Sequence, residues 1–200
     1  MKDKEIATKS AERLSFVAPM YARTSQRLPE DDAWTYEVKF DGYRVLAGRD
    51  STGVTLWSAR GNIFTDQFPQ LADAGEHLPP DTLLDGEIVA FKDGRISFNL
   101  LQRRRSGQAI LFYAFDVIIH RGKNLIKLPL ENRREILAEA LAELRPKTPL
   151  ICLSETIRCN PGQLIPLVKE FGFHGIIAKR KDSYYEIGKR SGAWVKYNVQ

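Results

Sequence analysis

The sequence contains very few of the side chains that build disulfide frameworks or zinc sites. Its 200 residues include two cysteines, Cys152 and Cys159, and three histidines scattered through the chain. Disulfide scaffolds and structural zinc sites need such residues in clusters at fixed spacings. The spacing here fits neither, so we expect both thiols to be reduced, as in a cytosolic protein.

The chain also lacks a long hydrophobic run. Its longest apolar stretch, residues 109–119, contains Asp116 and is too short to span a bilayer. Residues 1–10 carry charges but no apolar segment, which excludes a typical signal peptide. These absences predict a soluble, intracellular protein with no membrane partner.

What remains is a composition typical of a globular, slightly basic domain. Hydrophobic residues make up 43% of the chain, enough for a sizeable core. Lysine and arginine number 30 against 25 acidic residues, a formal net charge of +5. This excess is weak evidence for a polyanionic partner, such as a nucleotide or nucleic acid.

Hydrophobic patterning predicts alternating groups of strands and helices. Short alternating segments predict strands at 34–40, 43–49, 53–59, 82–91, 95–98, 109–119, 175–180 and 193–198. Helical spacing predicts helices at 65–78, 130–144 and 160–171, the last with Asn160 as N-cap. The mixed order and the hairpins favour an α+β fold with largely antiparallel sheets and flanking helices.

The segment KFDGYR, residues 39–44, carries the strongest chemical signal. A lysine that attacks phosphorus must be neutral, and partial burial and neighbouring cations favour that state. Arg44 could act as such a cation and also contact a phosphate. On these six residues alone, a solvated hairpin turn at Asp41-Gly42 is an equally good interpretation.

This hexapeptide resembles the nucleotidyl-acceptor motif of covalent nucleotidyltransferases, which comprise DNA ligases, RNA ligases and mRNA capping enzymes. Five further segments resemble family motifs and follow in the same order: 58–61, 84–87, 112–116, 175–180 and 194–196. Taken singly, each could be an ordinary turn, core strand or exposed strand charge. Together they cover residues 16–198, and their spelling most resembles bacterial ATP-dependent DNA ligases of the end-joining type.

The resemblance implies an ATP-grasp-like nucleotidyltransferase fold and a role for each matched residue. Lys39 would take AMP from ATP and pass it to the 5′-phosphate of nicked double-stranded DNA. Glu37 and Phe115 would hold adenine, and Val38 would also contact the nucleotide. The ribose and phosphate would be held by Arg44, Arg60 and Glu87, and the α-phosphate by Lys179 and Lys196. Glu87 and Asp41 would hold a divalent metal, Mg2+ or Mn2+. Arg190 is a further candidate for the site, with no role assigned to it.

Glu37 lies two residues before Lys39, so the two side chains share one face of a strand. In the family, a glutamate at this place reads the amino group of adenine. A carboxylate accepts a hydrogen bond from that amino group but is left unpaired against the carbonyl of guanine. Glu37 therefore favours ATP over GTP, and a ligase over a capping enzyme.

Two residues depart from the family pattern. His174 stands where a metal-site glutamate is usual, and Asn198 stands where the family has a second lysine after Lys196. Both changes weaken charge neutralisation in phosphoryl transfer. They leave open a degenerate module that binds nucleotide or DNA ends, beside an RNA ligase or capping-type enzyme; a plain basic structural module is remote.

The resemblance also implies a domain layout. We expect residues 1–15 to form an N-terminal lead-in and residues 16–200 the adenylation domain, with no OB-fold domain in this sequence. Such a monomer in the bacterial cytosol or nucleoid would work with a separate OB-fold, a repair polymerase or an end-binding protein. The basic run at 103–105 could contact DNA phosphates.

Overall fold

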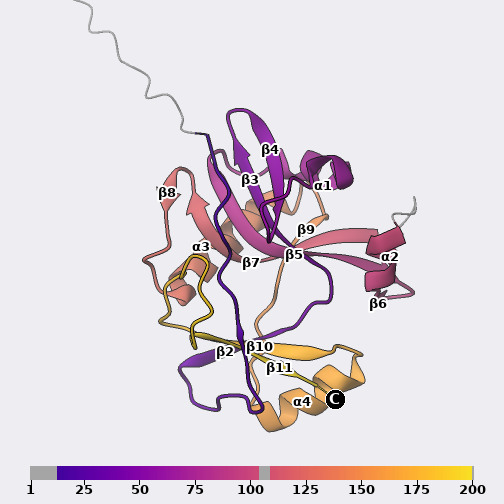
Figure 1. Ribbon diagram of the computed structural model, residues 1–200, viewed down its shortest axis with the longest axis vertical. Helices are drawn as coiled ribbons and strands as arrows, with labels where there is room; N and C mark the ends of the chain where they lie inside the picture. Colours follow the sequence, from indigo (N-terminus) through magenta and orange to yellow (C-terminus); the bar gives the residue numbers. More distant parts are fainter. Residues whose placement is uncertain (1–12, 104–108, 200) are drawn as a thin grey trace, which may run out of the picture.

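The computed structural model describes residues 13–103 and 109–199, and they form two sheets flanked by helices (Figure 1). The larger sheet has the order β4-β3-β5-β7-β8, with β6 paired to β5 and β9 paired to β7. Its strands are β3 (Tyr43–Asp50), β4 (Gly53–Ser58), β5 (Thr82–Lys92), β6 (Arg95–Ile96), β7 (Ala109–His120), β8 (Lys123–Asn124) and β9 (Ile151–Leu153).

The smaller sheet lies at the lower end of the molecule in Figure 1 and has the order β1-β11-β10-β2. Its strands are β1 (Arg23–Thr24), β2 (Trp34–Val38), β10 (Gly175–Arg180) and β11 (Trp194–Asn198). Among the described strands, β1 with β11 and β7 with β9 pair in parallel, and the other pairings are antiparallel. The prediction of an α+β fold with largely antiparallel sheets is confirmed.

The helices are short, and one of them differs from its prediction. They are the 3-10 helix η1 (Thr65–Gln67), α1 (Pro69–Gly75), α2 (Phe98–Arg103), α3 (Leu130–Leu144) and α4 (Pro161–Glu170). The single helix expected at 65–78 is wrong, because Phe68 breaks helical geometry and α1 begins at Pro69. Proline is well suited to the first position of a helix, where its missing N–H costs nothing. Asn160 caps α4 as expected and accepts from the Gln163 N–H at 2.9 Å.

Other local predictions need smaller corrections. The strand expected at 95–98 ends at Ile96, because Phe98 already begins α2. The short strands β1, β8 and β9 were not predicted, since two or three residues cannot display a period. Residues 1–12 of the expected lead-in and two arginines of the basic run, Arg104 and Arg105, lie outside the described residues.

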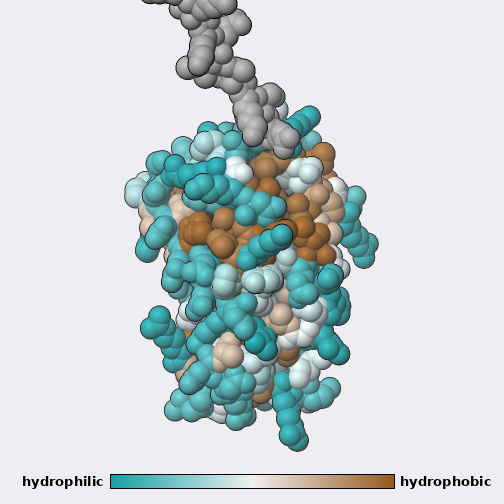
Figure 2. Space-filling model, turned by 90° about the vertical axis from the view of Figure 1, so that its left-hand side faces the viewer, coloured by the Kyte–Doolittle hydropathy of each residue, from teal (hydrophilic) through white to brown (hydrophobic). Residues whose placement is uncertain are grey.

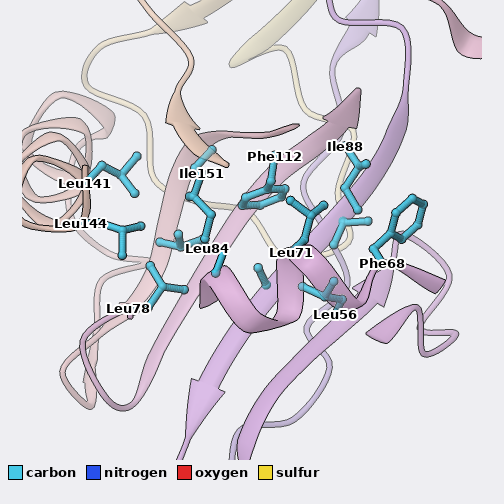
Figure 3. Packing of buried hydrophobic residues seen from close by; sticks show 14 of the residues in the cluster. Leu56, Phe68, Leu71, Leu78, Leu84, Ile88, Phe112, Leu141, Leu144 and Ile151 are labelled. Atoms are coloured by element: carbon cyan, nitrogen blue, oxygen red, sulfur yellow. The ribbon is translucent and has the colours of Figure 1, made fainter. Parts of the chain in front are cut away.

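The main hydrophobic core fills the space between the larger sheet and the helices α1 and α3. Figure 3 shows Leu141 and Leu144 of α3 and Leu71 of α1 pointing toward the sheet residues Leu84 and Phe112. All five are at most 5% exposed. This packing fixes β5 and β7, which carry several of the candidate site residues.

A second core joins the opposite face of the larger sheet to the smaller one. It is rich in aromatic residues: Phe115 and Tyr185 each pack edge to face against Trp194, with ring centroids 6.2 and 6.0 Å from that of the tryptophan. A buried ion pair between Arg133 and Asp116, at 2.8 Å, lies between α3 and β7. On the side shown in Figure 2, apolar residues form a band across the upper half, and the lower half is mostly hydrophilic. Among the described helices, none is long and apolar enough to cross a membrane.

Candidate nucleotide-binding and active site

A cavity of about 370 Å³ lies between the two sheets and collects most of the candidate residues. The candidates that line it are Glu37, Val38, Lys39, Asp41, Arg44, Glu87, Phe115, Lys179, Arg190 and Lys196. A larger cavity, of about 730 Å³, lies beside α3, and its lining residues include six carboxylates but not Lys39. The smaller cavity is therefore the one with the chemistry to bind and attack a nucleotide.

Lys39 follows β2 and lies against Gly175, the first residue of β10. Its N–H donates to the Gly175 carbonyl at 2.8 Å. A Cβ at Gly175 would lie 3.0 Å from Cδ of Lys39 and 2.5 Å from the Tyr197 carbonyl oxygen. The glycine thus leaves the space through which the Lys39 side chain passes, and this side chain lines the cavity.

Gly42 has an equally strict role in the segment that links Lys39 to β3. A Cβ there would lie 2.0 Å from the carbonyl oxygen of Ile88, so no other residue fits without moving β5. The Gly42 N–H donates to Oε1 of Glu87 at 3.0 Å. The Asp41-Gly42 segment is not a hairpin tip, because β2 and β3 belong to different sheets; it links the two sheets and brings the loop of Lys39 onto the carboxylate of β5.

Glu37 is buried at one end of the cavity, which we call the base end (Glu37, Phe115 and Lys179). Its exposed fraction is 2%. Its Oε1 lies 2.6 Å from Nζ of Lys179 and 3.5 Å from Nη1 of Arg134, and its Oε2 accepts from the Ser154 hydroxyl at 2.7 Å. The carboxylate is thus held from three sides by different parts of the chain.

Lys179 is also 2% exposed, and its Nζ donates to the Phe115 carbonyl at 3.3 Å. Burial lowers the pKa of Lys179 below its ordinary value, although the ion pair with Glu37 opposes that shift. The ammonium also lies 4.4 Å from the centre of the Phe115 ring. The structure therefore places Lys179 at the base end, and a contact with a phosphate would require Nζ to leave Glu37.

Phe115 lies on β7 with its ring surrounded by cations. Cζ of Arg44 is 4.5 Å from the ring centre, and Trp194 contacts the ring edge to face. Its exposed fraction is 8%, and it lines the cavity. Its position beside Glu37 and Lys179 is compatible with the expected contact to a base.

Arg44 is anchored as well as directed at the cavity. Its guanidinium bonds both oxygens of Asp85, at 2.6 and 2.7 Å, and donates to the Met20 carbonyl at 3.0 Å. The Tyr185 hydroxyl donates to Asp85 at 2.6 Å. Burial acts to lower the pKa of Arg44, but Asp85 more than offsets it and raises that pKa above its ordinary value. Arg44 is thus a fixed positive charge in the cavity wall.

The carboxylates Glu87 and Asp41 stand near the catalytic candidate Lys39. Burial raises the pKa of Glu87 to about 7, against the opposing effects of Arg44 and the Gly42 N–H. Asp41 is exposed at the cavity. Within the described ranges, no group of three His, Cys, Asp or Glu side chains could hold a metal. Mg2+ is commonly bound by one or two carboxylates together with substrate phosphates, so these two residues fit a metal that arrives with a nucleotide.

The remaining cations of the cavity lie on β11 and on the loop before it. Lys196 is half-buried on β11, and Arg190 is exposed before it. Arg190 donates to the Ala22 carbonyl at 2.6 Å and lies over the ring of Tyr21, 5.2 Å from its centre. Arg190 is thus ordered by the N-terminal segment at the rim of the cavity.

Two of the candidates, Arg60 and His174, are exposed and do not line the cavity, although both lie within the described chain. Arg60 is nevertheless connected to the cavity wall through its neighbour Ala59, whose N–H donates to the Arg44 carbonyl at 3.1 Å. The His174 carbonyl accepts from the Val199 N–H at 3.0 Å, and Asn198 pairs with Gly175. The two departures from the family pattern therefore meet at the same end of the β10–β11 pair.

Sequence reasoning missed two residues that hold the base end, Ser154 and Arg134. Ser154 follows β9, and Arg134 belongs to α3. Ser154 lies 117 positions after Glu37, its hydrogen-bond partner. No pattern in the sequence connects them, because the contact depends on how α3 and β9 pack against β7.

Solved structures define the class of protein. The crystal structure of the ligase domain from M. tuberculosis LigD superposes with a TM-score of 0.80 and 32% identity, over 91% of this chain and 60% of that one. The mycobacterial DNA ligase D complexed with ATP and MES gives a TM-score of 0.78 at 32% identity, over 90% and 59%. The fold is thus the nucleotidyltransferase fold of covalent ligases, with Lys39 and the cavity that it lines between its sheets.

Sequence comparisons show the family within that class. Residues 16–198 match the model of the ATP dependent DNA ligase domain. LigD of Pseudomonas aeruginosa is 35% identical over 190 residues, 92% of this chain and 22% of LigD. LigD of M. tuberculosis H37Rv is 34% identical over 165 residues, 82% and 21%. The SPbeta prophage-derived DNA ligase-like protein LigB of Bacillus subtilis is 32% identical over 186 residues, 90% and 67%.

The chain belongs to the ATP-dependent DNA ligase family, and it corresponds to the adenylation domain of these enzymes. It spans about a fifth of the length of these two LigD relatives.

Proposed function

We propose that Lys39 takes AMP from ATP and that the chain then transfers AMP to the 5′-phosphate of nicked double-stranded DNA. The observation that carries this proposal is the cavity that joins Lys39 to a buried carboxylate, an aromatic ring and fixed cations. The neutral Nζ of Lys39 attacks the α-phosphorus, a phosphorus–nitrogen bond forms, and the nitrogen, which is then positively charged, releases a proton to solvent. The bond from that phosphorus to the bridging oxygen breaks, and pyrophosphate leaves with the electron pair.

The base end accounts for selection of ATP. Glu37 accepts from the amino group of adenine, Phe115 contacts the ring, and Val38 ends β2 between Glu37 and Lys39. Guanine would place a carbonyl oxygen against the carboxylate, which repels it. Glu37 and Phe115 are both buried, so water would not relieve the repulsion between the carbonyl of guanine and the carboxylate.

The opposite end of the cavity, which we call the phosphate end (Lys39, Asp41 and Lys196), accounts for transfer. Arg44 and Lys196 place positive charge around the phosphates, with Arg190 at the rim. Glu87 and Asp41 would hold Mg2+ or Mn2+, which offsets phosphate charge when bound. The roles expected for Arg60 and for Lys179 at the α-phosphate stay predictions, and each requires movement of the side chain toward the nucleotide.

The test has two stages. The protein is incubated with labelled ATP or GTP and with Mg2+ or Mn2+, and labelled protein is then chased with nicked DNA or nicked RNA. We expect labelling by ATP, and transfer to the DNA that weakens as salt rises, because few phosphate contacts hold the duplex. Equal labelling by GTP, transfer only to RNA, or no label with either metal would contradict the proposal.

A further inference from the structure

The Glu37 carboxylate has two oxygens with different surroundings. Oε2 accepts from the Ser154 hydroxyl at 2.7 Å, and Oε1 faces Lys179 at 2.6 Å and Arg134 at 3.5 Å. Ser154 is completely buried and does not line the cavity, so it cannot contact a nucleotide itself. It can act only through Glu37.

Ser154 is itself fixed by the larger sheet and by α3. Its N–H donates to the Ala114 carbonyl at 2.8 Å, and its own carbonyl accepts from Arg134. Arg134 also donates to the Phe115 carbonyl at 3.3 Å. One arginine of α3 thus ties together the serine that holds Glu37 and the strand that carries Phe115.

This arrangement leaves one carboxylate oxygen for a ligand. Each oxygen of an ionised carboxylate has two acceptor positions, so Oε1 can bond Lys179 and still accept one more hydrogen. The hydroxyl on Oε2 restricts rotation of the carboxylate. The cations of Lys179 and Arg134 both lie near Oε1, and an ionised carboxylate is an acceptor only.

We propose that Ser154 and Arg134 are positioning residues for nucleobase selection, which hold Glu37 so that Oε1 meets the 6-amino group of adenine. This inference rests on the proposed use of ATP. Its alternative is a structural one, in which the two residues only fasten β2 to β9 and α3. The two alternatives predict different results for substitutions. If the residues only support the fold, their substitution slows the use of every nucleotide equally; if they position Glu37, it slows only the use of nucleotides that carry the 6-amino group.

The experiment compares ATP with purine riboside triphosphate, which lacks the 6-amino group. The rate of covalent nucleotide transfer to the protein is measured for both, and the ratio is taken for the wild type, Ser154→Ala and Arg134→Met. We expect the preference for ATP to fall by about threefold to tenfold in each variant, as for a weakened hydrogen bond to a charged group. In Glu37→Ala the ratio should fall close to one.

Ser183→Ala is the matched control. Its hydroxyl is also buried, but it donates to the Arg180 carbonyl at 2.7 Å, away from the cavity. The control should lose some stability and keep the wild-type ratio. An unchanged ratio in folded Ser154→Ala and Arg134→Met, with rates lowered alike for both nucleotides, overturns the inference and supports the structural role.

Two further measurements separate the inference from the proposed function. If the wild type forms no covalent adduct, the proposed function fails, and calorimetric binding of AMP and of purine riboside monophosphate still tests Ser154. If Ser154→Ala does not fold, Ser154→Thr keeps the hydroxyl and Arg134→Met carries the comparison. Equal affinity of the wild type for the two monophosphates would overturn the inference directly.

Discussion

The two ends of the cavity are built differently. At the base end, Glu37 and Lys179 are each 2% exposed and form an ion pair within the smaller sheet. Lys179 also donates to the Phe115 carbonyl of the larger sheet, and Glu37 also faces Arg134 of α3. At the phosphate end, Lys39 and Lys196 are half-buried, and within the described chain neither makes an ion pair within 4 Å. The charged groups of the base end are thus paired with one another within the fold, whereas the two lysines of the phosphate end have no such partner among the described residues.

The difference indicates a division of work. Groups that select a base must be held in one geometry before the ligand arrives, because their specificity depends on it. Groups that handle phosphates gain their partners only from the nucleotide and its metal. Changes at the base end should therefore alter both stability and selectivity, and changes at the phosphate end should alter rate with little effect on stability.

The largest expected effect is on the ion pair of the base end. Lys179→Met leaves the buried Glu37 carboxylate without its partner at 2.6 Å and should lower the free energy of unfolding by about 3–5 kcal/mol. Lys196→Ala, at the phosphate end, should change it by less than about 0.5 kcal/mol. Urea titrations of both variants give the comparison, and similar losses in the two would remove the distinction between the ends.

Lys196→Ala should instead slow the transfer of AMP. Removing one positive group from a site where phosphate charge develops should lower the rate of adenylate formation by about 100-fold. The measurement is the single-turnover rate with saturating ATP, with the melting temperature as a check on folding. A normal rate would place Lys196 away from the phosphates.

Glu37→Ala tests the base end by selectivity. The loss of one hydrogen bond to a charged group should weaken use of ATP by about 1.5–3 kcal/mol and should leave use of GTP less affected. The ratio of labelling rates for the two nucleotides reports this. The account would be contradicted by an equal loss for both, since Glu37 would then only support the fold.

The smallest expected effect belongs to His174, which is exposed next to the phosphate end. If it stands at the metal, Mn2+ should support faster adenylation than Mg2+, because imidazole suits Mn2+ better. His174→Glu should narrow that gap, with stability changed by less than about 0.5 kcal/mol. Initial rates in each metal decide it; unchanged rates would show that His174 lies away from the metal.

The sequence predicted most of the fold, because long alternating strands and helical periods are local signals. It failed where the signal is short or depends on tertiary packing. The helix at 65–78 breaks at Phe68, and the three residues of β9 are too few to show a period. Neither failure moved a motif residue, since no motif falls within residues 65–78 or within β9.

The motifs named residues that line one cavity, but they did not indicate how these residues are bonded. Glu37, Lys39 and Phe115 line it, whereas Arg60 and His174 do not, and the chemical roles of all five stay predictions. The sequence did not indicate that Lys179 is buried and bonded to Glu37 while Arg180, its neighbour, is exposed. Ser154 could not be found either, because its role depends on a contact across 117 positions.

The most direct test of the account is to map the residue that carries AMP. The protein is incubated with ATP and Mg2+ or Mn2+, digested, and each lysine peptide is examined by mass spectrometry for the added nucleotide. The account predicts the adduct on Lys39 and its loss in Lys39→Arg, because a guanidinium is not deprotonated. An adduct on Lys179 or Lys196, or one that persists in Lys39→Arg, would contradict the assignment of the nucleophile.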